Sequence, residues 1–204
     1  MIRDMDGIAW AASAMSAAQS RLEIAADNLA NASSDGFRRR VARGFLCARG
    51  ARIENSQSTD QGALRRTGRP FDLALVGGGA FALRNSRGDV SNTRSGAFTR
   101  DRFGHLRDDA GRLLLGRRGP IHVPSGSSID DDGFVRSAGR IIDQIALPAG
   151  AAIRSGFIET SNVNAIAEMV DVLCAQRSFE SAQKVLSAID VARAKATDEL
   201  ARLK

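Results

Sequence analysis

The side chains that most often perform catalysis or bind metals are scarce in this chain. His105 and His122 are the only histidines, and neither belongs to a Cys, Asp or Glu motif with metal-ligand spacing. Cys47 and Cys174 are the only cysteines, which is too few for a disulfide framework in 204 residues. We therefore expect no metal site and two free thiols, one of them buried as a small apolar side chain.

Two short motifs share features with ligand-binding loops, and both are better explained as turns. Gly77–Gly79 lacks the Gly-Lys-Ser/Thr ending of a phosphate-binding loop and does not open a helix. Asp130–Gly133 lacks the alternating oxygen ligands and final glutamate of a calcium loop, and it suits a hairpin turn. The sequence contains no serine-hydrolase or zinc-helix motif. We therefore predict that the protein is not an enzyme and uses no cofactor or small-molecule substrate.

Regular apolar spacing marks both ends of the chain. The N-terminal ladder recurs every seventh residue and consists of Met1, Ile8, Met15, Leu22 and Leu29. The C-terminal ladder advances in steps of three and four and consists of Val172, Ala175, Phe179, Ala182, Leu186, Ile189, Ala196, Leu200 and Leu203. Such spacing places one narrow apolar stripe on a helix, as coiled-coil packing requires. We predict helices over residues 5–31 and 163–202 that pair as a coiled-coil-like element.

Turn and capping signals delimit these helices and divide the middle of the chain into short strands. Gly36 supplies a left-handed residue after the first helix, and Ser161-Asn162 is the predicted N-cap of the second. Between them, short alternating runs are separated by glycine-rich turns, which is typical of antiparallel hairpins. The predicted fold class is α+β. An N-terminal helix and connector cover residues 1–45, a central antiparallel all-β domain covers 46–158, and a C-terminal helix over 159–204 pairs with the first segment.

The chain is basic, with 29 Lys plus Arg against 23 Asp plus Glu and a formal net charge of +6. The densest basic stretch consists of Arg38, Arg39, Arg40, Arg43, Arg49 and Arg52. Such a stretch can bind phosphate groups, which leaves a basic nucleic-acid-binding adaptor as an alternative function. Because no aromatic residues for base stacking are interleaved with these arginines, we favour a solvated connector that leaves the helix and expect no nucleic-acid partner.

The N-terminal segment does not have the pattern of a cleavable secretion signal. Asp4 and Asp6 interrupt it before any continuous apolar run can form. No apolar run elsewhere in the sequence is long enough to span a bilayer. We therefore expect no membrane span, and a protein that either stays in the cytoplasm or leaves it without such a peptide.

Longer motifs at both ends carry a family resemblance. Leu22–Asn31 ends in Asn-Leu-Ala-Asn, and Ser33–Arg38 contains Gly-Phe-Arg. Gly156–Asn164 contains Glu-Thr-Ser-Asn-Val, and Ala175–Glu180 reads Ala-Gln-Arg-Ser-Phe-Glu. These motifs resemble those of the bacterial flagellar rod and hook axial proteins, with Asp27 where Asn is usual. Motifs between residues 61 and 133 follow the same order, so that the resemblance spans nearly the whole chain.

The resemblance implies a structural subunit that polymerises through its terminal helices into a torque-transmitting axial tube. It implies export through the flagellar type III apparatus without a cleavable signal peptide, and a location in the periplasmic rod of the flagellar basal body. The implied partners are further copies of the chain and other axial proteins. The implied subunit-interface residues are Ile8, Met15, Leu22, Asn28, Leu29, Asn31, Gly36, Phe37, Asn162, Val163, Val172, Gln176, Arg177, Phe179, Leu186, Ile189 and Leu200.

Several alternatives stay open on the sequence alone. The modest size of the chain favours a proximal rod protein over a distal rod or hook-type subunit. A self-contained coiled-coil dimer with a β-cap is a further alternative. The segment before Gly156 is shorter than is usual in the family. Arg193 occupies a position in the C-terminal ladder, where it either reaches the rim or pairs with an acid on a neighbouring subunit.

Overall fold

The computed structural model describes residues 7–47, 50–148 and 150–202, without the side chains of residues 47 and 199–202. The chain forms two compact units. The helical unit draws on three segments, within residues 1–30, 39–58 and 163–204, and the β-unit on two, within 31–38 and 59–162. Met1, Arg49 and Leu203 of the predicted patterns lie outside the described residues.

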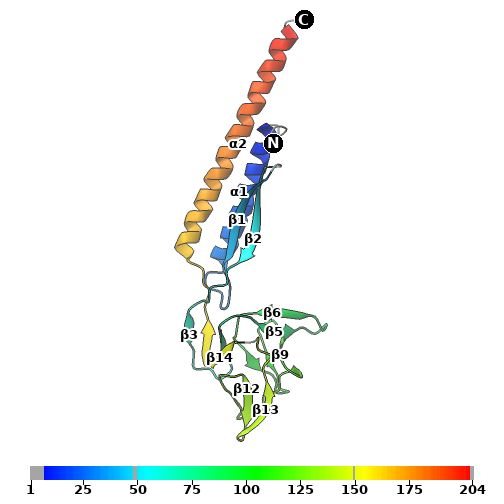
Figure 1. Ribbon diagram of the computed structural model, residues 1–204, viewed down its shortest axis with the longest axis vertical. Helices are drawn as coiled ribbons and strands as arrows, with labels where there is room; N and C mark the ends of the chain where they lie inside the picture. Colours follow the sequence, from blue (N-terminus) through cyan, green and yellow to red (C-terminus); the bar gives the residue numbers. More distant parts are fainter. Residues whose placement is uncertain (1–6, 48–49, 149, 203–204) are drawn as a thin grey trace. The chain divides into compact units, whose positions relative to one another are not determined.

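The helical unit consists of two helices and one hairpin. Helix α1 (Gly7–Ala30) and helix α2 (Ala165–Arg202) run antiparallel side by side, and the hairpin of β1 (Arg40–Cys47) and β2 (Gly50–Gln57) lies along α1 (Figure 1). A hydrogen bond of 3.3 Å from the backbone N–H of Ala51 to Ser13 Oγ joins β2 to α1. The predicted helices over residues 5–31 and 163–202 are therefore confirmed, with slightly shorter bounds.

Alanines form the most buried apolar positions of both helices. Ala11, Ala18 and Ala25 are buried at seven-residue intervals on α1, and Ala175 and Ala182 are buried on α2. Small side chains allow two helix axes to approach closely. The larger residues of the predicted ladders flank these alanines and are only half-buried. The α1 surface in contact with the rest of the unit is thus centred on alanines beside the predicted stripe.

The beginning of α2 differs from the prediction. Asn164 is the N-cap, because its Oδ1 accepts hydrogen bonds from the backbone N–H groups of Ile166 (3.1 Å) and Ala167 (3.2 Å). The predicted cap at Ser161-Asn162 is therefore wrong. Asn162 instead donates from Nδ2 to the carbonyl oxygen of Asp60, at 2.9 Å within the β-unit.

The β-unit is built from short antiparallel strands. They are β3 (Leu64–Arg66), β4 (Leu73–Val76), β5 (Phe81–Arg84), β6 (Val90–Thr93), β7 (Thr99–Arg100), β8 (Leu106–Arg107), β9 (Leu113–Gly116), β10 (Gly119–Pro120), β11 (Ser128–Ile129), β12 (Phe134–Ser137), β13 (Arg140–Gln144), β14 (Ala152–Ser155) and β15 (Phe157–Glu159). The largest sheet has the order β6-β5-β9-β8-β7, with β10 paired to β9. A second sheet has the order β11-β12-β13, and β14 pairs with β4 and β15 with β3. The predicted central antiparallel β-region is confirmed.

One apolar core fills the β-unit. Its fully buried members come from β4, β5, β8, β9, β12 and β14, from the segment before β11 and from the position just after β13: Leu73, Leu75, Phe81, Leu83, Leu106, Leu114, Ile121, Val123, Val135, Ile145 and Ile153. Phe81 and Phe98 meet edge to face, with ring centroids 5.4 Å apart. The short alternating runs predicted for the middle of the chain therefore contain core-facing strand residues such as Leu73 and Leu75.

Residues 40–57 correct two predictions. The basic stretch expected as a solvated connector is largely the β1–β2 hairpin, with Val41 opposite Ser56 in its register. This hairpin belongs to the helical unit, whereas residues 46–57 were expected in the central β-domain. The side-chain pattern of residues 40–57 does not by itself predict a strand. The segment forms one because β1 and β2 pair their backbone N–H and C=O groups in hydrogen bonds and pack on α1.

Candidate functional site

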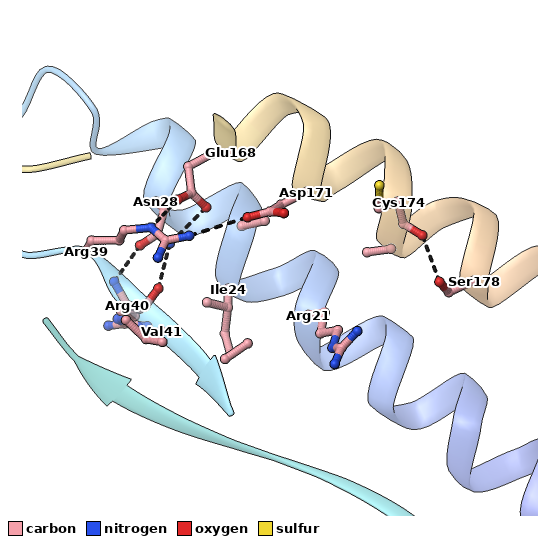
Figure 2. Close-up of a pocket in the computed structure, with 13 residues that line it drawn as sticks. Arg21, Ile24, Asn28, Arg39, Arg40, Val41, Glu168, Asp171, Cys174 and Ser178 are labelled. Atoms are coloured by element: carbon pink, nitrogen blue, oxygen red, sulfur yellow. Dashed lines mark hydrogen bonds and ion pairs between the residues drawn. The ribbon is translucent and has the colours of Figure 1, made fainter. Parts of the chain in front are cut away.

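A buried polar cluster joins the three segments of the helical unit. We define it as Asn28 of α1, Arg39 just before β1, Arg40 of β1 and Glu168 of α2 (Figure 2). Asn28 and Glu168 are each only 1% exposed. A polar group at that depth is costly unless its hydrogen bonds are made, so the geometry of this cluster decides its contribution.

The carboxylate of Glu168 has a partner on each oxygen. Asn28 Nδ2 donates to Glu168 Oε2 at 3.0 Å, and Arg39 Nε donates to Glu168 Oε1. Asn28 also fixes β1, because its Nδ2 donates to the carbonyl of Arg40 (2.8 Å) and its Oδ1 accepts the Arg40 N–H (2.7 Å). One asparagine side chain thus bonds to both β1 and α2.

Further ion pairs extend the cluster toward solvent. Arg39 Nη2 lies 3.3 Å from Asp171 Oδ2, and Arg40 Nη1 lies 3.0 Å from Asp27 Oδ2. Glu168 and Asp171 both stand near the N-terminus of α2, where the helix dipole favours negative charge. Arg39 and Arg40 are thus partly neutralised within the chain, which weakens the case for phosphate binding by the arginine stretch.

A shallow cleft of about 230 Å³ opens beside the polar cluster. Figure 2 shows Arg21 and Ile24 of α1 on one wall and Cys174 and Ser178 of α2 on the other. Cys174 is a free, exposed thiol, as expected for one of the two cysteines. The cleft combines cations, carboxylates and apolar surface in similar measure, so its lining does not specify one class of small ligand.

The predicted interface residues on the helices fall into two groups. The half-buried group consists of Ile8, Met15, Leu22, Leu29, Val172, Phe179, Leu186 and Ile189, together with Val163 just before α2. Gln176 and Arg177 are exposed, and Leu200 lies in α2 with its side chain outside the described part. Leu22, Leu29, Phe179 and Leu186 are thus already half-buried within one chain.

The other predicted interface residues belong to the β-unit, where they take part in tight backbone contacts. Asn31 and Phe37 belong to the turn after α1, and the Phe37 carbonyl accepts the N–H of Asn162 at 3.4 Å. Gly36 has φ +71°, and its N–H donates to the carbonyl of Glu159 at 2.7 Å. The left-handed conformation predicted for Gly36 is therefore confirmed.

A buried ion pair lies next to this turn within the β-unit. Arg94 and Glu159 are 5% and 1% exposed, and Arg94 Nε lies 3.0 Å from Glu159 Oε2. Arg94 also donates from Nη2 to the carbonyl of Gly77 (2.8 Å), and Glu159 Oε1 accepts the N–H of Gly62 (3.1 Å). Burial lowers the pKa of Arg94, with Glu159 opposing and Arg38 reinforcing that effect. This pair joins the β4–β5 connection and the β6–β7 connection to β15.

The residues first considered for catalysis occupy structural positions. His105 and His122 form an isolated β-bridge, with ring centroids 5.7 Å apart. Asp130–Gly133 is the predicted hairpin turn, in which Asp130 Oδ1 accepts the N–H of Phe134 at 2.8 Å. Within the described ranges, no three His, Cys, Asp or Glu side chains converge as a metal site requires. Nor does any helix of that part of the chain combine the length and apolarity needed to cross a membrane.

Sequence reasoning missed the residues of greatest structural interest. Arg39 was noted only as part of the basic stretch, although it forms the centre of the polar cluster together with Glu168. An exposed apolar stripe on α2 was also missed, although its spacing of three and four residues was readable in the sequence. It consists of Ile166, Met169, Val170 and Leu173.

Models of known families match both ends of the chain. Residues 8–38 match the family described as flagella basal body rod protein, and residues 154–199 match the flagellar basal body rod FlgEFG protein C-terminal family. These segments contain α1 with the following turn, and β15 with nearly all of α2. The two terminal helices thus lie in segments that match families of flagellar axial proteins.

Curated relatives extend the match over most of the chain. The flagellar basal-body rod protein FlgF of Escherichia coli K12 is 30% identical over 87% of this chain and 92% of its own length. The rod protein FlgG of Agrobacterium fabrum is 25% identical over 91% of this chain and 96% of its own. The hook protein FlgE of Brucella abortus matches at 36% identity over only 51% of this chain and 29% of its own. The chain belongs to the flagellar basal-body rod protein family, and its role is that of a structural rod subunit.

Proposed function

We propose that the helical unit is the polymerising part of a proximal rod subunit, and that α1 and α2 pack with neighbouring subunits in coiled-coil fashion. The antiparallel helix pair supplies two long surfaces, and the polar cluster keeps the helices and the hairpin in one register. Buried polar groups that must find one specific partner are best known for setting register. A subunit that transmits torque requires such fixed geometry at every repeat.

The observation that carries the proposal is the apolar surface that remains exposed on α2. Ile166 is 76% exposed and Leu173 is 58% exposed, although the opposite face of the same helix already packs on α1. A helix with apolar residues on two faces is expected to be covered on both. A neighbouring axial subunit can provide the second cover.

The proposed place in the cell is the periplasmic rod, reached through the flagellar type III export apparatus without a cleavable signal peptide. The proximal position is supported by relatives with the rod name that match over most of this chain and most of their own length, whereas the hook protein matches over about half of this chain and 29% of its own. In this proposal, the helical unit, within residues 1–30, 39–58 and 163–204, serves as the axial part, and the β-unit serves as the central domain. Transmission of torque needs rigid repeated interfaces and no bond chemistry, so no catalytic role is proposed.

A deletion and complementation experiment tests the proposed function. The gene is deleted in its source bacterium, and basal bodies are then purified from the deletion strain and from a strain that expresses an epitope-tagged wild-type chain. We expect incomplete basal bodies and lost motility in the first strain, and the tagged chain in the purified rods of the second. Complete basal bodies in the deletion strain, or a tagged chain absent from purified rods, would contradict the proposal.

A further inference from the structure

The buried ion pair of the β-unit lies close to a second arginine. Arg94 and Glu159 are 5% and 1% exposed, and Arg94 Nε lies 3.0 Å from Glu159 Oε2. Arg38 is half-buried in the segment after α1 and belongs to the same unit. We call Arg38, Arg94 and Glu159 the arginine site. Two guanidinium groups stand there against a single carboxylate, so the site has an excess of positive charge.

Backbone contacts hold Arg38 near the ion pair. The N–H of Gly36 donates to the carbonyl of Glu159 at 2.7 Å, and a Cβ on Gly36 would lie 2.4 Å from the carbonyl carbon of Arg94. Arg38 follows two residues later in the same segment. Its charge acts on Arg94, because burial lowers the pKa of Arg94, Glu159 opposes this effect, and Arg38 lowers that pKa further.

Buried nitrogen atoms of both arginines lack an acceptor. Arg94 Nη2 donates to the carbonyl of Gly77 at 2.8 Å, but Arg94 Nη1 and Arg38 Nε are buried and have no hydrogen-bond partner among the described residues. Glu159 Oε1 accepts the N–H of Gly62 at 3.1 Å, and its Oε2 faces Arg94 Nε, so neither oxygen is hydrogen-bonded to these two nitrogens. Because an unpaired buried donor is costly, native proteins usually satisfy it with water or an ion.

Charge and space decide between water and an ion. Water can accept hydrogen bonds but leaves the excess positive charge uncompensated, whereas an anion provides both an acceptor and a negative charge. The backbone beside Arg94 is closely packed. A Cβ on Gly36 would lie 2.2 Å from the nitrogen of Ser95, and a Cβ on Gly96 would lie 1.6 Å from the carbonyl oxygen of Leu73. Such packing favours a monatomic anion over a larger one such as phosphate.

We propose that the arginine site binds a small monovalent anion of the size of chloride, held between Arg38 and Arg94. The ion accepts hydrogen bonds from Arg38 Nε and Arg94 Nη1 and neutralises the charge that Glu159 leaves uncompensated. Because Arg38 is only half-buried, its side of the site is open to solvent. The site lies entirely within the β-unit and is independent of the proposed axial role of the helical unit. Since the anion binds the folded unit, it stabilises that unit.

Thermal unfolding of the purified full-length chain tests the site. Calorimetry follows the β-unit, and the fluorescence of Trp10 in α1 identifies the transition of the helical unit. Replacing sodium gluconate by about 0.15 M sodium chloride should raise the Tm of the β-unit by at least about 4 °C, as expected for a Kd about tenfold below that concentration. Gluconate is a much larger anion, and equal ionic strength keeps the screening of surface charges the same in both salts.

Three variants locate the anion at the arginine site. Arg38→Gln removes a guanidinium from the site and should abolish most of the difference in Tm between the two salts. Arg140→Gln removes the same charge from an exposed position on β13 and is the matched control, so it should keep the full difference. Glu159→Gln keeps an acceptor for the N–H of Gly62 but removes the carboxylate, so the chloride concentration at half of the Tm shift should fall at least about threefold.

Each variant is compared with itself in the two salts, so a general loss of stability does not obscure the result. An equal Tm of the wild-type β-unit in chloride and gluconate would overturn the proposal and indicate that water satisfies the buried donors. Equal chloride dependence of R38Q and R140Q would also overturn it, since chloride would then act elsewhere. An unchanged or higher chloride midpoint in E159Q would contradict the charge balance.

The line width of the chloride NMR signal provides a second measurement on the wild-type chain alone. Chloride that exchanges with a protein site should give a broader signal, and added bromide, a monatomic anion of the same charge, should reverse the broadening by competition. No broadening in the presence of the folded chain would refute the proposal.

Discussion

Replacement of Glu168 by alanine tests the polar cluster directly. The substitution removes the acceptor for Arg39 Nε and for Asn28 Nδ2, at a position that is 1% exposed. Each hydrogen bond to a charged group contributes about 1.5–3 kcal/mol. Arg39 is 35% exposed and keeps Asp171, while Asn28 keeps the carbonyl of Arg40, so part of this loss is recovered. We expect the helical unit to lose about 3 kcal/mol of unfolding free energy in E168A.

The single tryptophan makes the helical unit separately observable. Trp10 lies in α1 and the chain has no tyrosine, so Trp fluorescence during urea unfolding reports on this unit alone. A loss of 3 kcal/mol corresponds to a fall in Tm of roughly 12–24 °C for a unit of this size. Asp171→Ala is the control, since Asp171 is 55% exposed and its pair should contribute less than about 1 kcal/mol.

A double-mutant cycle decides whether Glu168 and Arg39 act together. If they do, the loss in R39A/E168A is smaller than the sum of the losses in R39A and E168A, by about 1–2 kcal/mol. An additive result within about 0.5 kcal/mol would refute the reasoning, as would an E168A loss no larger than that of D171A.

Three further predictions concern the β-unit. Gly36→Ala should lower the unfolding free energy of the β-unit by at least about 2 kcal/mol. Gly36 has φ +71°, and a Cβ at this position would lie 2.2 Å from the backbone nitrogen of Ser95. An unchanged Tm in calorimetry would contradict this prediction. Arg94→Ala leaves Glu159 buried without its ion-pair partner and should lower the unfolding free energy by about 3–5 kcal/mol. The double variant R94M/E159L removes both charges and should be clearly more stable than R94A. Equal stability of the two variants in urea unfolding would argue against a penalty for the buried charge. Burial acts to raise the pKa of Asp101, but hydrogen bonds from the N–H groups of His105 and Phe103 outweigh this effect and hold the pKa below its ordinary value. The stabilisation by this carboxylate is present above the unfolded-state pKa of about 4 and is lost as the pH falls through the lowered pKa. Asp101→Asn should therefore be destabilising at about pH 7 and progressively less so as the pH falls below about 4; a pH-independent difference in Tm would contradict the assignment.

The elements that repeat a simple pattern were predictable from the sequence. The heptad and three-four spacing around Leu22 and Phe179 indicated both helices, because one apolar face recurs with the helical period. Strands such as Leu73–Val76 followed from alternation between glycine turns. Gly36 was predictable because few residues other than glycine adopt a left-handed conformation at a helix end.

Features that depend on contacts between distant segments were not predictable in the same way. Arg40–Cys47 has no strict alternation, and it forms a strand because β2 and α1 offer partners that local sequence does not reveal. Glu168 gave no periodic signal, since a buried carboxylate is recognisable only once Asn28 and Arg39 are seen beside it. The N-cap was misplaced because Ser161, Asn162 and Asn164 have equally suitable side chains, and only the structure shows which one the helix uses.

The division of the helical unit among three segments has a kinetic consequence. The β-unit takes most of its residues from one continuous stretch, 59–162, so its contacts can form as soon as that stretch is available. Glu168 lies 140 residues from Asn28 in the chain, so forming the polar cluster closes a long loop. The entropy cost of this closure is offset only when α2 has packed against α1 and the hairpin. In a chain that becomes available from its N-terminus onward, α1 and the β1–β2 hairpin are therefore present long before α2, their partner helix. The β-unit should acquire protection from hydrogen exchange first, and the helical unit should remain the last cooperative element to form.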